Sequence, residues 1–311
     1  MSQHRPFRFG IQGRTTGPRD EWLEMVRRVE ALGYSSFLAL DHFVRGLDPV
    51  ASLMAAAMAT TTLRVGGFVF DNDFRHPAVL AKSAATIDVL SGGRFELGIG
   101  AGWLKEEYDQ TGIPFDSAPV RIDRMVEAVH LIKKIFGEEP PVSFAGEHYT
   151  VTDLVCPPRP VQQPHPPIMI GGGGKRLLTV AAREADIVGI TTRARPDGSK
   201  DTTDLTAAAT DRKIAWVKEA AGTRFPDIEL NAVIGDVVPT DDGAGEAARL
   251  ADRYGVSSDE ARDSPLILIG SVDEMVERLQ ERRERFGISY VVVTEPNMDA
   301  LAPVVARLAG R

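Results

Sequence analysis

The chain has 311 residues, of which 43% are hydrophobic and 26% are charged, a composition typical of a globular protein with a buried core. Its net charge of -8 argues against a nucleic acid or an anionic membrane as the main partner, because both would favour clustered Lys and Arg. The single cysteine, Cys156, cannot form an internal disulfide, and the spacing of Cys and His predicts no metal site. No apolar signal region precedes the first predicted strand, so we expect a cytoplasmic protein.

Strand and helix patterns alternate regularly in the first third of the chain. The predicted strands begin at residues 7, 36, 64 and 94, at intervals of 29, 28 and 30 residues. One strand followed by one helix has this length, and a repeat of such units forms a parallel sheet. Apolar residues at helical spacing predict the intervening helices. The first of them ends before Gly33, and the next two cover 49–61 and 77–90.

The alternation continues after an insertion. A helix over 119–136 leads to the insertion at 137–166, which contains a small hairpin followed by a proline-rich loop. Four further strands are predicted at 168–170, 186–190, 229–238 and 290–294. Further helices are predicted at 175–185, 243–254, 258–262 and 272–285, and another helix ends at about residue 221. The polar segment 192–204 predicts a mobile loop that could act as a lid.

Eight strands alternating with helices define the expected fold. No change in composition divides residues 1–311, so we predict an α/β protein with a single (β/α)8 TIM-type barrel that carries insertions. Barrels of this kind perform their chemistry in the loops after the strands, at the C-terminal face. The loops 71–76 and 100–103 follow two such strands and are expected on that face.

Asp41 and His42 stand where the second strand ends. Histidine is the side chain best suited to move a proton near neutral pH, and a flanking carboxylate can fix its tautomer or raise its pKa. His42 is therefore the candidate catalytic residue. A structural histidine on a loop is the alternative interpretation of the same pair.

Two glycine-rich segments are candidates for binding a phosphate. The first contains Gly100, Ala101, Gly102 and Trp103; the second contains Gly171, Gly172, Gly173 and Gly174. The second lies between a strand and a helix N-terminus, where backbone N–H groups and the helix dipole favour an anion. Neither matches a dinucleotide-binding or Walker motif, and a plain tight turn is the structural alternative.

Four motifs together resemble the luciferase-like monooxygenase superfamily, and within it the branch that uses the deazaflavin coenzyme F420. They are the segments 40–43 (LDHF), 74–81 (FRHPAVLA), 90–103 (LSGGRFELGIGAGW) and 167–174 (PIMIGGGG). The likeness is dense over 36–136 and 157–190 and thin over 192–265. It implies a TIM-type barrel that binds a flavin or deazaflavin at the C-terminal ends of its strands.

The resemblance also assigns roles to particular residues. Phe68 and Val69 match a non-proline cis peptide that forms a bulge behind the tricyclic ring of the cofactor. The two glycine-rich segments match the loops that hold the ribityl phosphate, and Asp41 is grouped with the cofactor-binding residues. His42 matches a histidine that deazaflavin-using relatives place beside the reacting ring carbon.

Two departures from the family pattern restrict the substrate. Sugar-phosphate dehydrogenases of this branch carry a glutamate directly after the glycine loop and a tryptophan a few residues beyond the histidine. Here those positions hold Trp103 and Gly46. The resemblance therefore implies a small organic substrate in an apolar pocket rather than a sugar phosphate.

The leading hypothesis is hydride transfer between coenzyme F420 and this substrate, with His42 supplying or accepting the proton. The alternative is an FMN-dependent monooxygenase that receives reduced flavin from a partner reductase and activates oxygen. A flavin-binding protein without turnover and a non-redox lyase acting on a phosphorylated compound are hypotheses of other classes. The alanine-rich helix at 49–61 could pack against a second copy in a homodimer, or against its own barrel.

Overall fold

The computed structural model of the chain describes residues 5–13, 16–195 and 199–311. Among these residues, eight parallel strands form a closed barrel, because β3 pairs with β2 on one side and with β5 on the other. Around the barrel the strands are β1 (Arg8–Gly13), β2 (Ser36–Ala39), β3 (Arg64–Gly67), β5 (Phe95–Gly100), β8 (Ile168–Gly172), β9 (Ile187–Ile190), β10 (Glu229–Ile234) and β13 (Ile288–Thr294). The predicted fold is confirmed.

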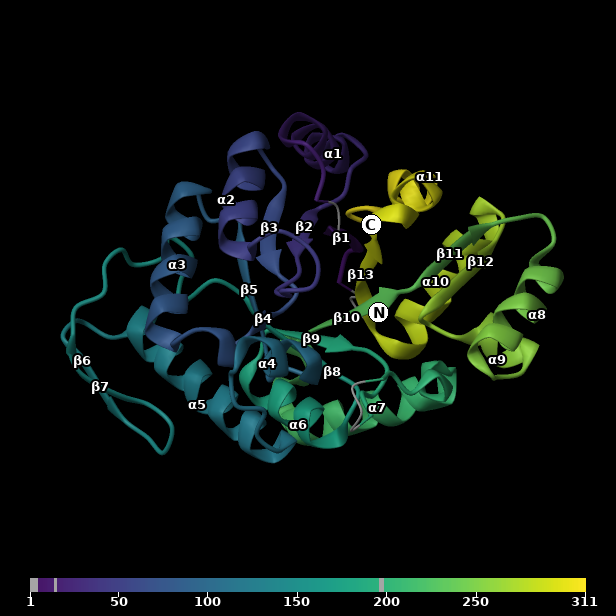
Figure 1. Cartoon of the computed structure of the whole chain (residues 1–311). Coiled ribbons are helices and arrows are strands. Elements are labelled where there is room, and N and C mark those ends of the chain that lie inside the picture. Colours follow the sequence, from purple (N-terminus) through teal and green to yellow (C-terminus); the bar gives the residue numbers. More distant parts are fainter. Residues whose placement is uncertain (1–4, 14–15, 196–198) are drawn as a thin grey trace.

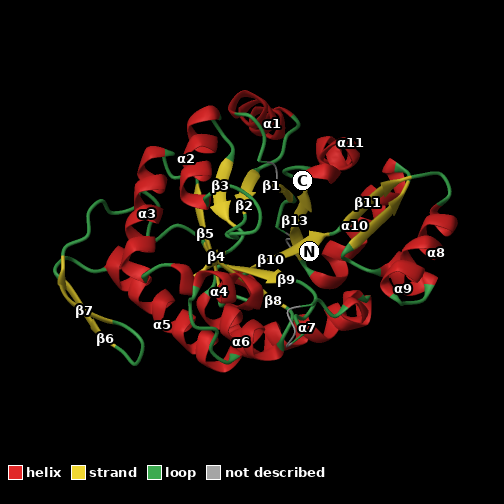
Figure 2. Cartoon of the chain, viewed as in Figure 1, coloured by secondary structure: helices red, strands yellow, loops and turns green. Residues whose placement is uncertain are grey.

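Helices cover the outside of the barrel (Figures 1 and 2). They are α1 (Arg19–Ala31), α2 (Pro49–Ala59), α3 (Pro77–Leu90), α5 (Ala118–Gly137), α6 (Lys175–Glu184), α7 (Ala207–Ala221), α10 (Val272–Phe286) and α11 (Met298–Leu308). In α3, Pro77 occupies the first turn and the side chain of His76 caps it, while Leu80 and Ile87 are buried toward the strands. Of the helices in the described part of the chain, none combines the length and apolar character that a membrane span requires.

The predicted seventh strand is two strands in the structure. β10 ends at Ile234, and after Gly235 the chain leaves the barrel as β11 (Asp236–Pro239), which pairs with β12 (Ile267–Gly270). The helices α8 (Gly243–Tyr254) and α9 (Ser258–Asp263) connect these two strands, as Figure 1 shows. The prediction of one strand over 229–238 was wrong. The apolar pattern continues on both sides of Gly235, and a single glycine is a weak signal for the end of a strand.

The predicted hairpin is present and extends away from the barrel (Figure 1). Its strands are β6 (Val142–Ala145) and β7 (Thr150–Leu154), paired antiparallel. The carboxylate of Glu127 on α5 accepts hydrogen bonds from the backbone N–H groups of Glu147, His148 and Tyr149 in the turn. This contact fixes the hairpin to the helix that precedes it.

The structure contains two helices that the sequence did not predict, α4 (Lys105–Thr111) and α11. Short elements also break the loops after the strands, namely β4 (Phe70–Asp71) and the 3-10 turns Asn72–Phe74, Thr202–Leu205, Gly222–Asp227 and Glu295–Asn297. The predicted mobile loop 192–204 contains residues 196–198, which lie outside the described residues. In its described parts Ala194 bridges to Lys200, and its mobility stays a prediction.

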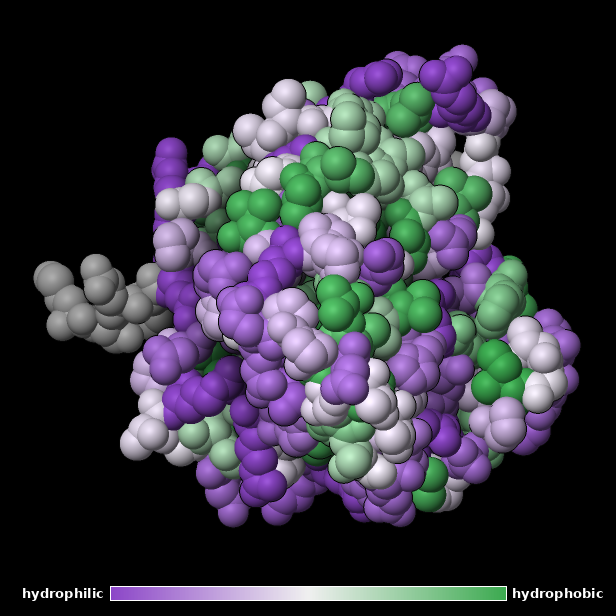
Figure 3. Space-filling model, turned by 90° about the vertical axis from the view of Figure 1, so that its left-hand side faces the viewer, coloured by the Kyte–Doolittle hydropathy of each residue, from purple (hydrophilic) through white to green (hydrophobic). Residues whose placement is uncertain are grey.

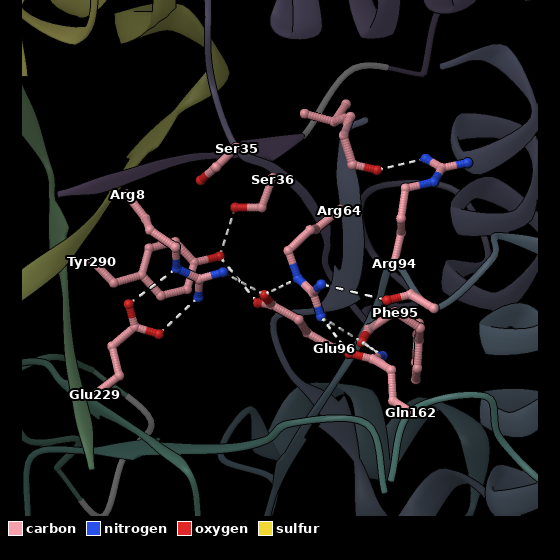
Figure 4. Close-up of polar contacts among 12 residues, drawn as sticks. Arg8, Ser35, Ser36, Arg64, Arg94, Phe95, Glu96, Gln162, Glu229 and Tyr290 are labelled. Atoms are coloured by element: carbon pink, nitrogen blue, oxygen red, sulfur yellow. Dashed lines mark hydrogen bonds and ion pairs between the residues drawn. The ribbon is translucent and has the colours of Figure 1, made fainter. Parts of the chain in front are cut away.

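The N-terminal end of the barrel is closed by a buried ionic network (Figure 4). Glu96 lies between two arginines, 2.7 Å from Nη1 of Arg8 and 2.6 Å from Nε of Arg64. Burial opposes ionisation of Glu96, but the two guanidinium groups outweigh it and lower its pKa. Arg8 also pairs with Glu229 at 2.9 Å and stacks on the ring of Tyr290. These residues lie within the first three positions of their strands, at the end of the barrel opposite the loops that were predicted to carry the site.

Large hydrophobic side chains are exposed on neighbouring helices, with Met58 of α2 69% exposed and Val79 of α3 58% exposed. Figure 3 views the side of the molecule on which these helices lie in Figure 1, and hydrophobic residues appear there between polar ones. A homodimer through α2 stays a prediction.

Candidate functional site

An inner chamber of about 450 Å³ opens at the C-terminal ends of the barrel strands. The predicted residues that line it are Asp41, His42, Phe68, Val69, Gly100, Gly102, Trp103 and Gly171. Apolar side chains from other strands, among them Leu40, Met169 and Val233, complete the wall. The position agrees with the general placement of chemistry in barrels of this kind.

An outer cavity of about 640 Å³ adjoins the chamber. Its lining includes the remaining predicted residues, Ala101, Gly172, Gly173 and Gly174. Val69, Gly102 and Trp103 line both spaces, so the two are continuous. The structure thus brings all the predicted residues to one continuous cleft, while their roles in binding stay predictions.

His42 contacts a carboxylate, but not the one next to it in sequence. Its Nδ1 lies 2.8 Å from Oε2 of Glu107, and its ring meets the ring of Trp103 edge-on at 5.9 Å. The carboxylate of Asp41 instead accepts hydrogen bonds from Arg75 and from the backbone N–H of Asp71. The idea that the flanking Asp41 orients His42 is therefore wrong, because Asp41 is held by the loop after the third strand.

Helix α4 supplies the residues that sequence reasoning missed. Glu107 and Tyr108 are adjacent on it and both are 1% exposed. Glu107 faces His42, whereas the hydroxyl of Tyr108 reaches Asp71. The segment carries no apolar stripe, and its sequence signal is the glycine that ends it, Gly112, in the left-handed conformation.

Asp71 places a second titratable group on the chamber wall. Its two carboxylate oxygens each lie 3.0 Å from the Tyr108 hydroxyl, and Oδ1 also accepts from the backbone N–H of Asp73. Burial raises the pKa of Asp71 to about 7, and the nearby charges of Asp73 and Asp41 add to this effect against the two hydrogen bonds. The sequence analysis placed the loop 71–76 at this face but assigned Asp71 no role.

The peptide bond between Phe68 and Val69 is cis, as the family resemblance predicted. It lies between β3 and β4, where both residues line the chamber. The side chain of Val69 occupies the space that a side chain at Gly100 of β5 would need, because a Cβ there would lie 2.5 Å from Val69 Cγ2. At Gly98 a Cβ would meet the backbone of β3, 2.0 Å from the carbonyl oxygen of Gly67. Packing against this bulge therefore requires a glycine at position 100.

The glycines of the run 171–174 differ in their surroundings. A Cβ on Gly173 would lie 2.4 Å from the backbone nitrogen of Arg193, so the loop after β9 packs directly on it. Gly174 has open space around its Cα and is the N-cap residue of α6. The helix N-terminus thus faces the outer cavity, an arrangement that favours an anion.

Cationic side chains gather along the outer cavity. Among the described residues its lining holds five, Arg121, Arg176, Arg193, Arg195 and Lys200, against the single carboxylate Asp116. The guanidinium of Arg121 is turned to the backbone, with Nε 3.0 Å from the carbonyl oxygen of Ala101 and Nη2 3.3 Å from that of Gly102. It fixes the glycine loop after β5. Of the other cations, Arg176 pairs with Asp123, and Arg193 and Arg195 pair with Asp201.

The closed parallel barrel with a site at the C-terminal ends of its strands places the chain among the barrel proteins that bind ligands through loops after their strands. The model of the family "Luciferase-like monooxygenase" matches residues 5–226, which is more than half of the chain. The chain belongs to this family.

The relatives found by sequence include an FMNH(2)-dependent enzyme and F420-dependent enzymes. The chain is 30% identical over 182 residues to the FMNH(2)-dependent dimethylsulfone monooxygenase of Pseudomonas putida, covering 57% of this chain and 50% of that protein. It is 33% identical over 178 residues to the F420-dependent glucose-6-phosphate dehydrogenase of Amycolatopsis mediterranei, covering 55% and 52%. The chain spans about half the length of the curated relatives it matches.

Solved structures with the same fold cover nearly the whole chain. An F420-dependent secondary alcohol dehydrogenase in complex with an F420-acetone adduct superposes with a TM-score of 0.75 at 21% identity, over 96% of this chain and 97% of that one. The coenzyme F420-dependent tetrahydromethanopterin reductase of Methanopyrus kandleri gives a TM-score of 0.78 at 18% identity, over 97% and 99%. At these identities the likeness shows the fold.

Proposed function

We propose that the chain is an oxidoreductase that binds coenzyme F420 in the continuous cleft and transfers a hydride between it and a small organic substrate. The observation that carries this proposal is the inner chamber, where His42, Trp103 and the Phe68–Val69 bulge face one space. When bound, a deazaflavin ring supplies or accepts the hydride. His42 is the group of this chain that moves the accompanying proton.

The residues present fit such a cofactor. The N-terminus of α6 and the glycines before it suit a phosphate, because unpaired helical N–H groups and the helix dipole favour negative charge. Leu40, Phe68, Met169 and Val233 give the inner chamber apolar walls that suit an organic ring and a substrate without a phosphate. Trp103 lines the boundary between the two spaces.

The cations of the outer cavity favour F420 over FMN. Arg176, Arg193 and Arg195 lie along one wall, and each would exchange its present aspartate partner for an anionic group of a long ligand, whereas FMN carries a single phosphate. The FMN-dependent monooxygenase remains the second candidate, since the dimethylsulfone monooxygenase relative uses FMNH(2). That function would also require a partner reductase.

Fluorescence titration of the apoprotein with F420 and, separately, with FMN tests the proposal. Gly174→Asp is the informative variant, because aspartate is a favoured N-cap residue and position 174 has room for it, yet its charge would oppose a phosphate. Gly174→Asn is the matched control, with the same shape and no charge. We expect tight binding of F420, weakened at least tenfold by the aspartate and nearly unchanged by the asparagine.

The same titration separates the alternatives. Preference for FMN would replace the proposal with the monooxygenase, and saturation with neither cofactor would overturn the cofactor assignment. His42→Ala should bind F420 with wild-type affinity, because the proposed role of His42 is proton transfer rather than binding.

A further inference from the structure

We infer that Glu107 is a positioning residue that holds His42 as the tautomer protonated on Nδ1, so that Nε2 faces the chamber as a proton acceptor. This inference rests on the proposed function for its catalytic meaning, but the geometry stands by itself. Glu107 is contributed by α4 and His42 by the loop after β2, 65 residues apart in sequence. Their side chains are 2% and 10% exposed.

The carboxylate of Glu107 is held in one orientation by the backbone of the loop that carries His42. Its Oε1 accepts hydrogen bonds from the backbone N–H groups of Phe43 at 2.7 Å and Val44 at 3.2 Å. Its other oxygen, Oε2, therefore remains directed at Nδ1 of His42, 2.8 Å away. A carboxylate only accepts hydrogen bonds, so the proton of this contact belongs to Nδ1.

Arg45 gives the same result from the other side of the ring. Its Nη2 lies 3.2 Å from Nε2 of His42, and a guanidinium group is a donor with no acceptor atom. Nε2 must therefore carry a lone pair in this contact. The two contacts agree on a neutral imidazole with its proton on Nδ1, although each involves a different element of the structure.

This arrangement has a consequence for proton transfer. Arg45 is an exposed residue of the loop and lines the inner chamber, so a proton donor of the substrate can replace its N–H group at Nε2. Among the described residues, the charged groups in contact with the His42 ring are Glu107 from α4 and Arg45 from its own loop, while Trp103 meets the ring edge-on. Asp41, Asp71 and Lys200 also line the chamber. When Nε2 takes up a proton, Nδ1 on the opposite side of the ring keeps its hydrogen bond to the carboxylate of Glu107.

Glu107→Gln tests this role without changing the size of the side chain. The amide has one oxygen, and the two backbone N–H groups of Phe43 and Val44 both require an acceptor. The oxygen therefore faces the backbone and the NH₂ group is presented to Nδ1, which must now accept. We expect the variant to switch His42 to the tautomer protonated on Nε2, which removes the lone pair from the chamber.

The measurement is the ¹⁵N chemical shift of both ring nitrogens in the cofactor-free protein at mildly alkaline pH. The sequence has six histidines, so the spectrum of His42→Ala assigns the resonances. The wild type should be protonated on Nδ1 and Glu107→Gln on Nε2. Glu106→Gln, the same change at the exposed preceding residue of α4, should match the wild type. A wild-type proton on Nε2, or the same tautomer in the wild type and Glu107→Gln, would overturn the inference.

A kinetic readout then connects the tautomer with catalysis. We expect Glu107→Gln to lower the kcat of hydride transfer by about 10²- to 10⁴-fold, the usual contribution of a general acid or base, with KM and F420 affinity within about threefold. A switched tautomer with an unchanged kcat would overturn the catalytic meaning of the contact. Failure to bind F420 at all would instead contradict the proposed function and leave the tautomer measurement intact.

Discussion

The hydroxyl of Tyr108 lies 3.0 Å from both carboxylate oxygens of Asp71, and both side chains are buried beside the inner chamber. Tyr108 is adjacent in sequence to Glu107, so one turn of α4 contacts two titratable residues of the chamber lining, Asp71 and His42. A helix of seven residues thereby fixes both Asp71 and His42.

The raised pKa of Asp71 predicts a pH-dependent cost to stability. The unfolded carboxyl ionises near its ordinary value of 3.8, whereas the folded one keeps its proton up to about pH 7. Between these values the native state binds more protons than the unfolded state, so the free energy of unfolding falls as pH rises, by up to about 4 kcal/mol in total. Asp71→Asn should flatten this part of the stability profile, measured by urea unfolding from pH 4 to 8. Asp109→Asn, an exposed change, should leave the profile unchanged.

Lys213 is expected to anchor the loop after β9. Its Nζ is buried 2.7 Å from Oδ2 of Asp204 and donates to the carbonyl oxygen of Thr191 at 2.8 Å. Asp204 in turn accepts from the backbone N–H of Arg193 at the wall of the outer cavity. Lys213→Met would leave a buried carboxylate without its cation, so we expect a loss of about 3–5 kcal/mol in urea unfolding and weaker cofactor binding.

The neighbouring residue provides the control for this change. Arg212 is largely exposed and its guanidinium lies 4.0 Å from Asp204. Arg212→Met should therefore change stability by less than about 1 kcal/mol. Equal effects of the two substitutions would contradict the role of the buried ion pair.

Replacing Arg121 by lysine should weaken cofactor binding although the charge at this position is kept. Its guanidinium donates to the carbonyl oxygens of Ala101 and Gly102 and stacks on the ring of Phe115 at 3.9 Å. Lysine keeps the charge but cannot bond both carbonyls from a planar group, so Arg121→Lys should loosen the glycine loop. We expect cofactor affinity to fall about tenfold, measured by fluorescence titration. Wild-type affinity would show that the loop holds its conformation without these bonds.

The ionic network at the N-terminal end of the barrel should affect stability alone. Glu96→Gln removes the charge between Arg8 and Arg64, and breaking a buried ion pair in this way costs about 3–5 kcal/mol. Cofactor affinity should not change, because the network and the cleft lie at opposite ends of the strands. Glu21→Gln, at an exposed position of α1, is the control for unfolding. Reduced cofactor affinity in folded Glu96→Gln would contradict the separation of the two ends.

The sequence by itself determined the barrel and the location of the cleft. Strand and helix periodicity are local properties of the chain, and in a parallel barrel the loop after every strand lies on the same face. This rule explains why one cleft contains His42, the Phe68–Val69 bulge and both glycine segments. The same local signals failed at Gly235, where the pattern of a strand continues although the chain leaves the barrel.

Only the tertiary structure decided which groups act together in the cleft. Asp41 is adjacent to His42 in sequence but pairs with Arg75, while Glu107 comes from 65 residues away to contact the imidazole. Sequence adjacency does not predict these side-chain contacts, because the partner of a side chain depends on which other elements pack against it in the folded protein. The segment that carries Glu107 is short and polar, so its burial depends on the barrel beneath it rather than on any pattern of its own.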